Sequence, residues 1–334
     1  MAKKLKIMVL ATGSATKLIE TIESRGFEYT LAKPKDFDIY LSSSVHGHDA
    51  LYLNGEKLVA SQYDACISRL GEHREFGGKV IRQLQNMGIF CVQSGEAIDT
   101  CADKFKSAQI MSKARIRVPR QFYSTDPESA KMIIDKLGGL PVILKELSGS
   151  KGKGLILLES PRQTNMTLES YLGGGRKIIL QEYLDNGGKD ERHIVCGGKV
   201  VNSMQRQSPS DDIRANLSLN GTGTPITPDP ETEKMCIDAV AAIPGLNFAG
   251  VDIMKNKNED GELIPYFIEI NSNPGEMIME VTGHNHYEDL LDYVERNYNK
   301  KQPGEVKQTT TVESDMVSDE EAAEYARKIV NREL

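Results

Sequence analysis

Three oxygen-bearing side chains stand at the end of two neighbouring strands that the sequence predicts near residues 249–271. Glu269 and Asn271 lie two residues apart in an apolar strand, so both point to the same face of it. Asp252 lies in the preceding strand, between apolar neighbours. Buried strands carry such groups at a cost unless a cation or hydrogen bonds satisfy them. We therefore predict a Mg²⁺ site that also takes phosphate oxygens, with hydrogen-bonded strand ends as the alternative.

Two lysines and a glycine-rich turn offer positive charge and close backbone approach. Lys104 opens a predicted helix, and Lys145 ends an apolar strand that leads into a turn. The turn residues predicted to cradle phosphate are Gly149, Ser150, Lys151, Gly152 and Gly154. The turn is neither a Walker loop nor a dinucleotide fingerprint, because no helix follows its glycines. An ordinary glycine-rich hairpin is the alternative.

Further polar residues suit a nucleotide, although each is weak alone. A strand ending at Gln181, Glu182, Tyr183 and Leu184 offers a backbone edge for a purine, and Asp190 beyond it suits ribose hydroxyls. Arginines suit phosphate or carboxylate oxygens through their two-pronged geometry. The candidates of this kind are Arg206 and Arg214, which with Asn216 are predicted to be catalytic. Arg192, close to Asp190, is predicted to belong to the nucleotide site. Ordinary polar turns and a charged surface loop are the alternative.

The elements that must position these residues follow from the apolar pattern. A strand over 6–11, a Thr12-Gly13-Ser14 turn and a helix over 15–25 predict a doubly wound α/β unit. A second such unit spans 65–92, so residues 1–97 form one small domain. Further helices are predicted over 102–114, 126–137, 230–242 and 286–295. Further strands are predicted over 141–146, 155–158, 177–183, 192–196, 199–206, 249–255 and 263–271. Residues 302–312 predict a linker and 318–331 a short helix.

Composition narrows the class of protein. The 334 residues carry a net charge of −7, which disfavours nucleic acid as a partner. No apolar run approaches the length of a membrane span. The five cysteines are scattered and lack metal-ligand spacing, so we expect reduced thiols in a cytoplasmic protein. The pairs His46/His48 and His284/His286 are interpreted as surface-loop histidines, although His284 follows the metal strand closely enough to line an acceptor site.

The order of these motifs resembles the RimK-type branch of the ATP-grasp superfamily over residues 1 to about 300. The matching pieces are Arg69-Leu70-Gly71, Asp103-Lys104, Val118-Pro119, Lys145 with its loop, Gln181-Glu182-Tyr183, Asp190-Glu191-Arg192, Arg214-Ala215-Asn216, Ala249-Gly250-Val251-Asp252 and Glu269 to Gly275. The resemblance implies an α/β plus α+β chain with the ATP-grasp fold. Its expected parts are a pre-ATP-grasp domain (1–97), a central lobe with a glycine-rich lid (98–183), a C-terminal lobe with the metal site (184–300) and a tail (301–334).

The resemblance also implies roles. Lys104 and Lys145 touch ATP phosphates, the edge near Glu182 holds adenine, and Asp190 holds the ribose. Arg214 and Asn216 serve the γ-phosphate, and Asp252, Glu269 and Asn271 bind Mg²⁺ or Mn²⁺. A carboxylate attacks the γ-phosphate, and an amine then displaces phosphate from the acyl phosphate. Ser150-Lys151 departs from the usual loop, and the connector after Glu182 is slightly short; neither removes a catalytic group.

The substrate stays open at this stage. Glutamate is the first expectation for the amino acid, and a peptide, a protein C-terminus or a small molecule for the acceptor. Glutathione-synthetase-like and carrier-protein ligases are alternatives within the superfamily. A nucleotide-binding regulator without turnover and a dinucleotide-dependent oxidoreductase are alternatives outside it; the intact metal set opposes the first, and the missing G-x-G-x-x-G opposes the second. The resemblance also favours a homo-oligomer.

Overall fold

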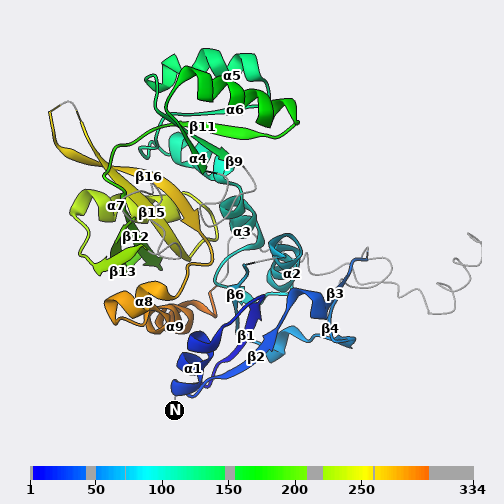
Figure 1. Cartoon of the computed structure of the whole chain (residues 1–334). Helices are drawn as coiled ribbons and strands as arrows, with labels where there is room; N and C mark the ends of the chain where they lie inside the picture. Colours follow the sequence, from blue (N-terminus) through cyan, green and yellow to red (C-terminus); the bar gives the residue numbers. More distant parts are fainter. Residues whose placement is uncertain are drawn as a thin grey trace, which may run out of the picture.

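The N-terminal part of the chain is built on a parallel sheet. The computed structural model describes residues 3–42, 50–71, 73–146, 155–208, 221–258 and 260–300. The sheet order is β2-β1-β6-β7, and residues 7–10 of β1 are buried, as expected of a central parallel strand (Figure 1). The strands are β1 (Lys6–Ala11), β2 (Glu28–Ala32), β6 (Ala65–Arg69) and β7 (Phe90–Cys91), with helices α1 (Thr16–Ser24), α2 (Arg74–Asn86) and α3 (Gly95–Ala102). A small antiparallel sheet joins β3 (Phe37–Tyr40), β4 (Ala50–Leu53) and β5 (Glu56–Lys57).

The central lobe has an antiparallel sheet of its own, in the order β10-β9-β11-β8. Its strands are β8 (Gln121–Ser124), β9 (Val142–Glu146), β10 (Leu155–Leu158) and β11 (Ile178–Glu182). Its helices are α5 (Pro127–Ile133) and α6 (Pro161–Gly173), and α4 (Lys104–Lys113) leads into it. Leu144, Leu168 and Leu180 belong to a buried cluster confined to this lobe. The central lobe therefore has a separate hydrophobic core.

The C-terminal lobe carries a five-stranded antiparallel sheet in the order β14-β13-β12-β15-β16. Its strands are β12 (Lys189–Cys196), β13 (Lys199–Gln207), β14 (Thr222–Pro225), β15 (Phe248–Lys257) and β16 (Leu263–Asn271). Its helices are α7 (Pro230–Ala241), α8 (Met277–Thr282) and α9 (His286–Asn297). The pair α8 and α9 lies between this lobe and the N-terminal sheet (Figure 1).

One buried cluster spans the N-terminal part and the C-terminal lobe. It contains Ile7 and Val9 of β1, Phe248 of β15, and Tyr287 and Leu290 of α9. The helix predicted over 286–295 is α9, and its buried face, with Tyr287, Leu290 and Val294, packs into this cluster. The N-terminal domain thus shares one of its two buried clusters with the lobe that carries the proposed metal ligands, and the other is its own.

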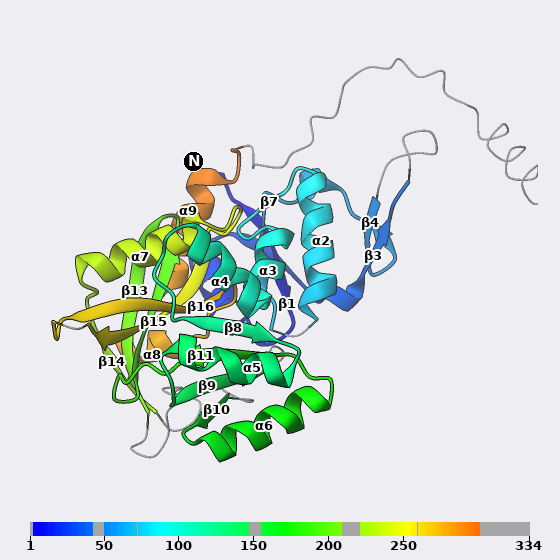
Figure 2. The same ribbon diagram turned by 90° about the horizontal axis from the view of Figure 1, so that it is seen from above.

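Three helices, α3, α6 and α8, were not predicted from the sequence. The predicted helix over 102–114 was wrong at its start, because Asp103 is extended and its carboxylate caps α4 by accepting from the backbone of Phe105 and Lys106. Residues before this break form α3, inside which the predicted boundary after residue 97 falls. Helix α6 was not predicted, since it is mostly polar. Figure 2 shows α3 between α2 and α4. No helix in the described part of the chain is long and apolar enough to cross a membrane.

Candidate active site

The three predicted metal ligands share one face of two paired strands. Asp252 on β15 is the register partner of Glu269 on β16, and Asn271 pairs with Gly250. The register shifts after Asp252, an irregularity of the kind that re-aims side chains beside functional sites. Asp252 is buried, whereas the Glu269 side chain is 34% exposed and can reach a ligand. The arrangement brings two carboxylates and one amide together.

Both predicted phosphate lysines lie beside Glu269. The Lys104 Nζ stands 3.8 Å from Glu269 Oε2, because the start of α4 packs near β16. The Lys145 Nζ on β9 donates to Gln181 Oε1 on the neighbouring β11, 2.7 Å away. Burial and the positive charge of Lys104 lower the pKa of Lys145 to about 8, against the opposing pull of Glu269. Two ammonium groups therefore share a small space, which an anionic ligand such as a polyphosphate would relieve.

A chain of ion pairs crosses the sheet behind these groups. The Arg192 guanidinium binds Asp252 through Nε and Nη2, at 2.7 and 2.6 Å. Arg206 binds Asp190 through Nε at 2.6 Å and reaches Asp252 Oδ2 at 3.0 Å. Burial opposes ionisation of Asp252, but the two arginines outweigh it and hold its pKa well below the ordinary value. Asp252 is thus kept ionised and fixed in orientation, as a cation ligand must be.

The residues present fit a divalent cation. Asn271 Nδ2 and Asn273 Oδ1 are buried and have no hydrogen-bond partner among the described residues. An unpaired buried oxygen close to Glu269 in sequence and an ionised Asp252 are what a hard cation satisfies. Within the described ranges, no group of three or more His, Cys, Asp or Glu side chains is placed to hold a metal ion. A cation here would consequently need the amide oxygen of Asn271 beside the two carboxylates.

Comparisons with known proteins place this site in a family. Residues 101–294 match the model of the RimK-like ATP-grasp domain, and residues 5–98 match the RimK PreATP-grasp domain. The chain belongs to the RimK family of ATP-grasp proteins. A probable alpha-L-glutamate ligase from Maridesulfovibrio salexigens is 34% identical over 297 residues, covering 88% of this chain and 94% of the relative. One of the same name from Methanococcoides burtonii is 33% identical over 287 residues, covering 85% and 92%.

Solved structures agree on the ATP-grasp fold. The ATP-grasp ligase PsnB, solved with a phosphomimetic precursor variant, Mg and ADP, has a TM-score of 0.68 at 17% identity, over 87% of this chain and 98% of PsnB. D-alanine–D-alanine ligase from Bacillus anthracis, solved with ATP, has a TM-score of 0.60 at 17% identity, over 89% and 97%. The predicted fold and family are confirmed, and this RimK family member is a ligase that forms carbon–nitrogen bonds.

The predicted nucleotide edge is only partly open in the RimK-like domain. The Glu182 carboxylate accepts from the backbone N and the Nε of Arg120, at 2.7 and 2.6 Å, so it ties β11 to residue 120. Tyr183 is half-buried and Leu184 is buried. Asp190 is buried, and its carboxylate is engaged by Arg206 rather than open to solvent. Contacts of these residues with adenine and ribose stay predictions.

Some predicted site residues lie outside the described residues. They are Gly149, Ser150, Lys151, Gly152, Gly154, Arg214 and Asn216. The histidines His46 and His48 also lie outside them. The interpretation of His286 as a surface histidine was wrong: it begins α9, is fully buried, and packs beside Phe248 and Tyr287. His284 is exposed and contacts Asp289 at 2.7 Å.

Two residues that hold the end of β16 in place were not among the predicted site residues. The Gln93 Nε2 donates to the backbone oxygens of Phe248 and Ser272, at 3.1 and 3.0 Å, while Ser68 donates to its Oε1. Arg69 Nη1 donates to the Pro274 oxygen at 2.7 Å. Arg69 is the last residue of β6 and Gln93 follows β7, so the N-terminal sheet holds the segment after Asn271 in place. The Arg69-Leu70-Gly71 motif was the only sequence signal for them.

Proposed function

We propose that this protein uses ATP and Mg²⁺, or Mn²⁺, to join an amino acid to the carboxylate of a peptide, protein C-terminus or small acceptor. One observation carries the proposal. Lys104, Lys145 and Glu269 converge from three different elements, with Asp252 and Asn271 on the same face as Glu269. Positive charge for phosphate and oxygen ligands for a cation thus lie side by side, as phosphoryl transfer requires.

The residues of this chain would divide the work as follows. Lys104 and Lys145 would hold the phosphates, and the glycine-rich turn over 149–154, which lies outside the described residues, is the proposed backbone cradle for them. Asp252, Glu269 and Asn271 hold the cation, which when bound neutralises charge on the phosphoryl oxygens. Arg214 and Asn216 contact the γ-phosphate. Arg206 and Arg192, which are bound to Asp252, act as positioning residues that fix this carboxylate.

The reaction proceeds in two balanced steps. An oxygen of the acceptor carboxylate bonds to the γ-phosphorus while the bond to ADP breaks, which gives an acyl phosphate. The amine nitrogen then bonds to the acyl carbon, phosphate leaves, and the amine loses a proton. The chain contributes mainly orientation and charge stabilisation to both steps.

Glutamate is our first candidate for the amine. The basis is the name alpha-L-glutamate ligase, carried by relatives that align with 85–88% of this chain. A peptide acceptor is consistent with PsnB, which was solved with a precursor peptide. The enclosed thiols and the net charge of −7 favour a cytoplasmic protein that does not bind nucleic acid.

A ligase screen tests the proposal. Purified protein, ATP and Mg²⁺ are incubated with each amino acid, alone and with peptides ending in different residues, and both phosphate release and product mass are followed. The proposal predicts phosphate release that depends on glutamate and a product heavier by one glutamate residue. Product with another amino acid only would replace glutamate, and no amide product with any pair would contradict ligation.

A further inference from the structure

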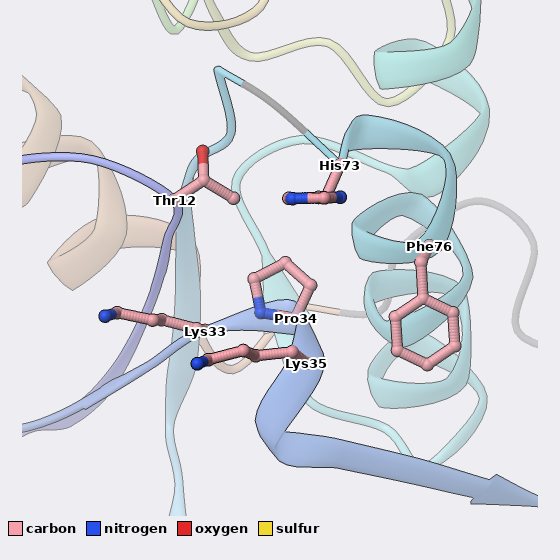
Figure 3. A pocket seen from close by; sticks show the side chains of 6 residues that line it. All are labelled: Thr12, Lys33, Pro34, Lys35, His73 and Phe76. Atoms are coloured by element: carbon pink, nitrogen blue, oxygen red, sulfur yellow. The ribbon is translucent and has the colours of Figure 1, made fainter.

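A second pocket lies in the N-terminal domain, apart from the lysine and carboxylate cluster. It has a volume of about 540 Å³, within the range of small-molecule sites. Figure 3 shows the six side chains that line it. They are Thr12, Lys33, Pro34, Lys35, His73 and Phe76.

The pocket lies at the carboxyl edge of the parallel sheet. Strand β1 has β2 on one side and β6 on the other, so the order of the sheet reverses between β1 and β6. Thr12 follows β1, Lys33 follows β2, and His73 stands between β6 and α2. Open α/β sheets bind ligands at this position, because the loops diverge there and leave a crevice. The location therefore favours a ligand site over an accidental hollow.

The charge of the pocket favours an anion. Lys33 and Lys35 are exposed, and neither ammonium forms an ion pair with another described residue. Their side chains extend in the same direction (Figure 3). His73 is the N-cap of α2 and its side chain makes no capping bond, so the positive end of a 13-residue helix adds to the field. This local cluster of positive charge lies on a chain whose net charge is −7.

The remaining lining residues favour one kind of anion, a carboxylate attached to a short apolar chain. Pro34 and Phe76 contribute apolar surface. The Thr12 hydroxyl also lines the pocket, but it already accepts from the Gly71 backbone N at 2.8 Å. A phosphate ester would gain little from the apolar wall. An acidic side chain presents methylene groups and a charge together, which matches both kinds of lining.

Contacts connect the pocket to the ligase site. The Thr12 backbone N donates to the Arg69 oxygen at 3.2 Å, and Arg69 Nη1 donates to the Pro274 oxygen at 2.7 Å. Pro274 follows Asn271 by three positions. Arg69 thus joins the pocket wall to the end of the proposed metal strand.

We propose that this pocket is a carboxylate subsite, in which Lys33 and Lys35 hold an acidic side chain of the peptide whose terminal carboxylate the ligase activates. The proposal rests on the proposed function for the identity of the peptide. The same carboxylate chemistry could instead come from free glutamate, and the experiment separates the two.

Binding is measured first, without turnover. A fluorescein-labelled tetraglutamate peptide is titrated with wild type and with Lys33→Ala/Lys35→Ala, and anisotropy is followed. We expect about tenfold weaker binding in the double variant, from two lost charge-assisted contacts. The matched control is Lys3→Ala/Lys4→Ala, which removes the same charge at the opposite edge of the sheet and should bind like wild type. Circular dichroism checks that the variants are folded.

The outcomes test the proposed subsite separately from the proposed ligase activity. Equal peptide affinity in wild type and double variant overturns the subsite, as does an equal loss in the control variant. Where turnover is found, the double variant should raise the KM for the acidic peptide about tenfold and leave the KM for ATP unchanged. A raised KM for free glutamate alone would assign the pocket to the amino acid and overturn the proposal. Lysine-dependent binding without any amide product would support the subsite and contradict only the proposed function.

Discussion

Lys145 is the residue whose charge responds most directly to its surroundings. Its ammonium is held beside Gln181, near Lys104 and Glu269. Burial and Lys104 lower its pKa to about 8 from an ordinary 10.5. The folded state therefore binds fewer protons than the unfolded state between these values, and stability contributed by this group rises with pH across that window. A ligand phosphate would favour the charged form.

This shift predicts a pH dependence of ATP binding. Lys145 carries its charge below about pH 8 and loses it above, so the KM for ATP should rise above pH 8 in wild type. Lys145→Arg keeps its charge throughout and should lack this rise, even if its KM is higher at neutral pH. Steady-state kinetics from pH 6.5 to 9.5 check this, with the exposed Lys106→Arg as control. Parallel profiles for all three proteins would contradict the assignment of Lys145 to the phosphates.

At the residue scale, the sequence predicted which residue types would form the site, but not which side chains they would contact. Strand alternation placed Glu269 and Asn271 on one face, because the period of a strand is fixed. The pairing of Asp252 with Arg192 depends on which strands become neighbours, which is a property of the assembled sheet. The bond between Glu182 and Arg120 joins segments 62 positions apart for the same reason.

At the scale of elements, α3 packs closely against α2. This contact positions the segment that leads from α3 to Lys104 at the start of α4. A Cβ on Gly95 would collide with the backbone oxygen of Gly78 in α2. Backbone cannot move as cheaply as the end of a side chain, so this helix pair accepts only glycine at position 95. The helix that follows Asp103 then carries Lys104 toward Glu269.

Gly95→Ala should therefore destabilise the protein by about 1–3 kcal/mol. Gly173→Ala is the matched control: it lies in α6 with nothing within 4 Å of the added carbon, and should be neutral or slightly stabilising. Urea unfolding followed by circular dichroism measures both. Equal midpoints for Gly95→Ala and wild type would show that the two helices can separate without cost.

Several strands could be predicted from their apolar runs, whereas a mostly polar helix could not be predicted. The bounds of β1, β10 and β16 match the predicted strands, since buried strands are continuous or alternating apolar runs. Helix α6 buries only Thr164, Leu168 and Leu172, too few for a clear stripe. Its start signal, Ser160 followed by Pro161, was present in the sequence.

At the scale of the whole molecule, the N-terminal domain has two buried clusters. One, which includes Met8, Leu10 and Ile81, is confined to residues 8–98, and the other is shared with the C-terminal lobe. Ile7 and Val9 of β1 share a cluster with α8, α9 and the C-terminal sheet, and Arg25 binds Glu288 and Glu295 of α9. The central lobe buries its own leucines. The N-terminal domain and the C-terminal lobe are thus joined by a shared core, whereas the central lobe has a hydrophobic core of its own.

A fragment of residues 1–97 should accordingly fail to fold cooperatively. Removing α9 would expose the apolar face of β1 and α1 that it covers, and burial of such surface is the main stabilising term at about 25 cal/mol per Å². Residues 1–300 should melt sharply. Thermal unfolding of both chains checks this, and a sharp transition of the fragment at the same temperature would contradict a shared core.

The most direct test of the central claim is amide formation by Glu269→Ala beside wild type, with ATP, Mg²⁺, glutamate and the peptide acceptor found in the screen. Glu269 is one-third exposed, and its one ion pair with another described residue is the 3.8 Å contact with Lys104, so its loss should leave the circular dichroism spectrum unchanged. We expect no detectable amide by mass spectrometry in this variant, and wild-type amounts in the exposed control Glu20→Ala. Amide formation at the wild-type rate by Glu269→Ala would contradict the site.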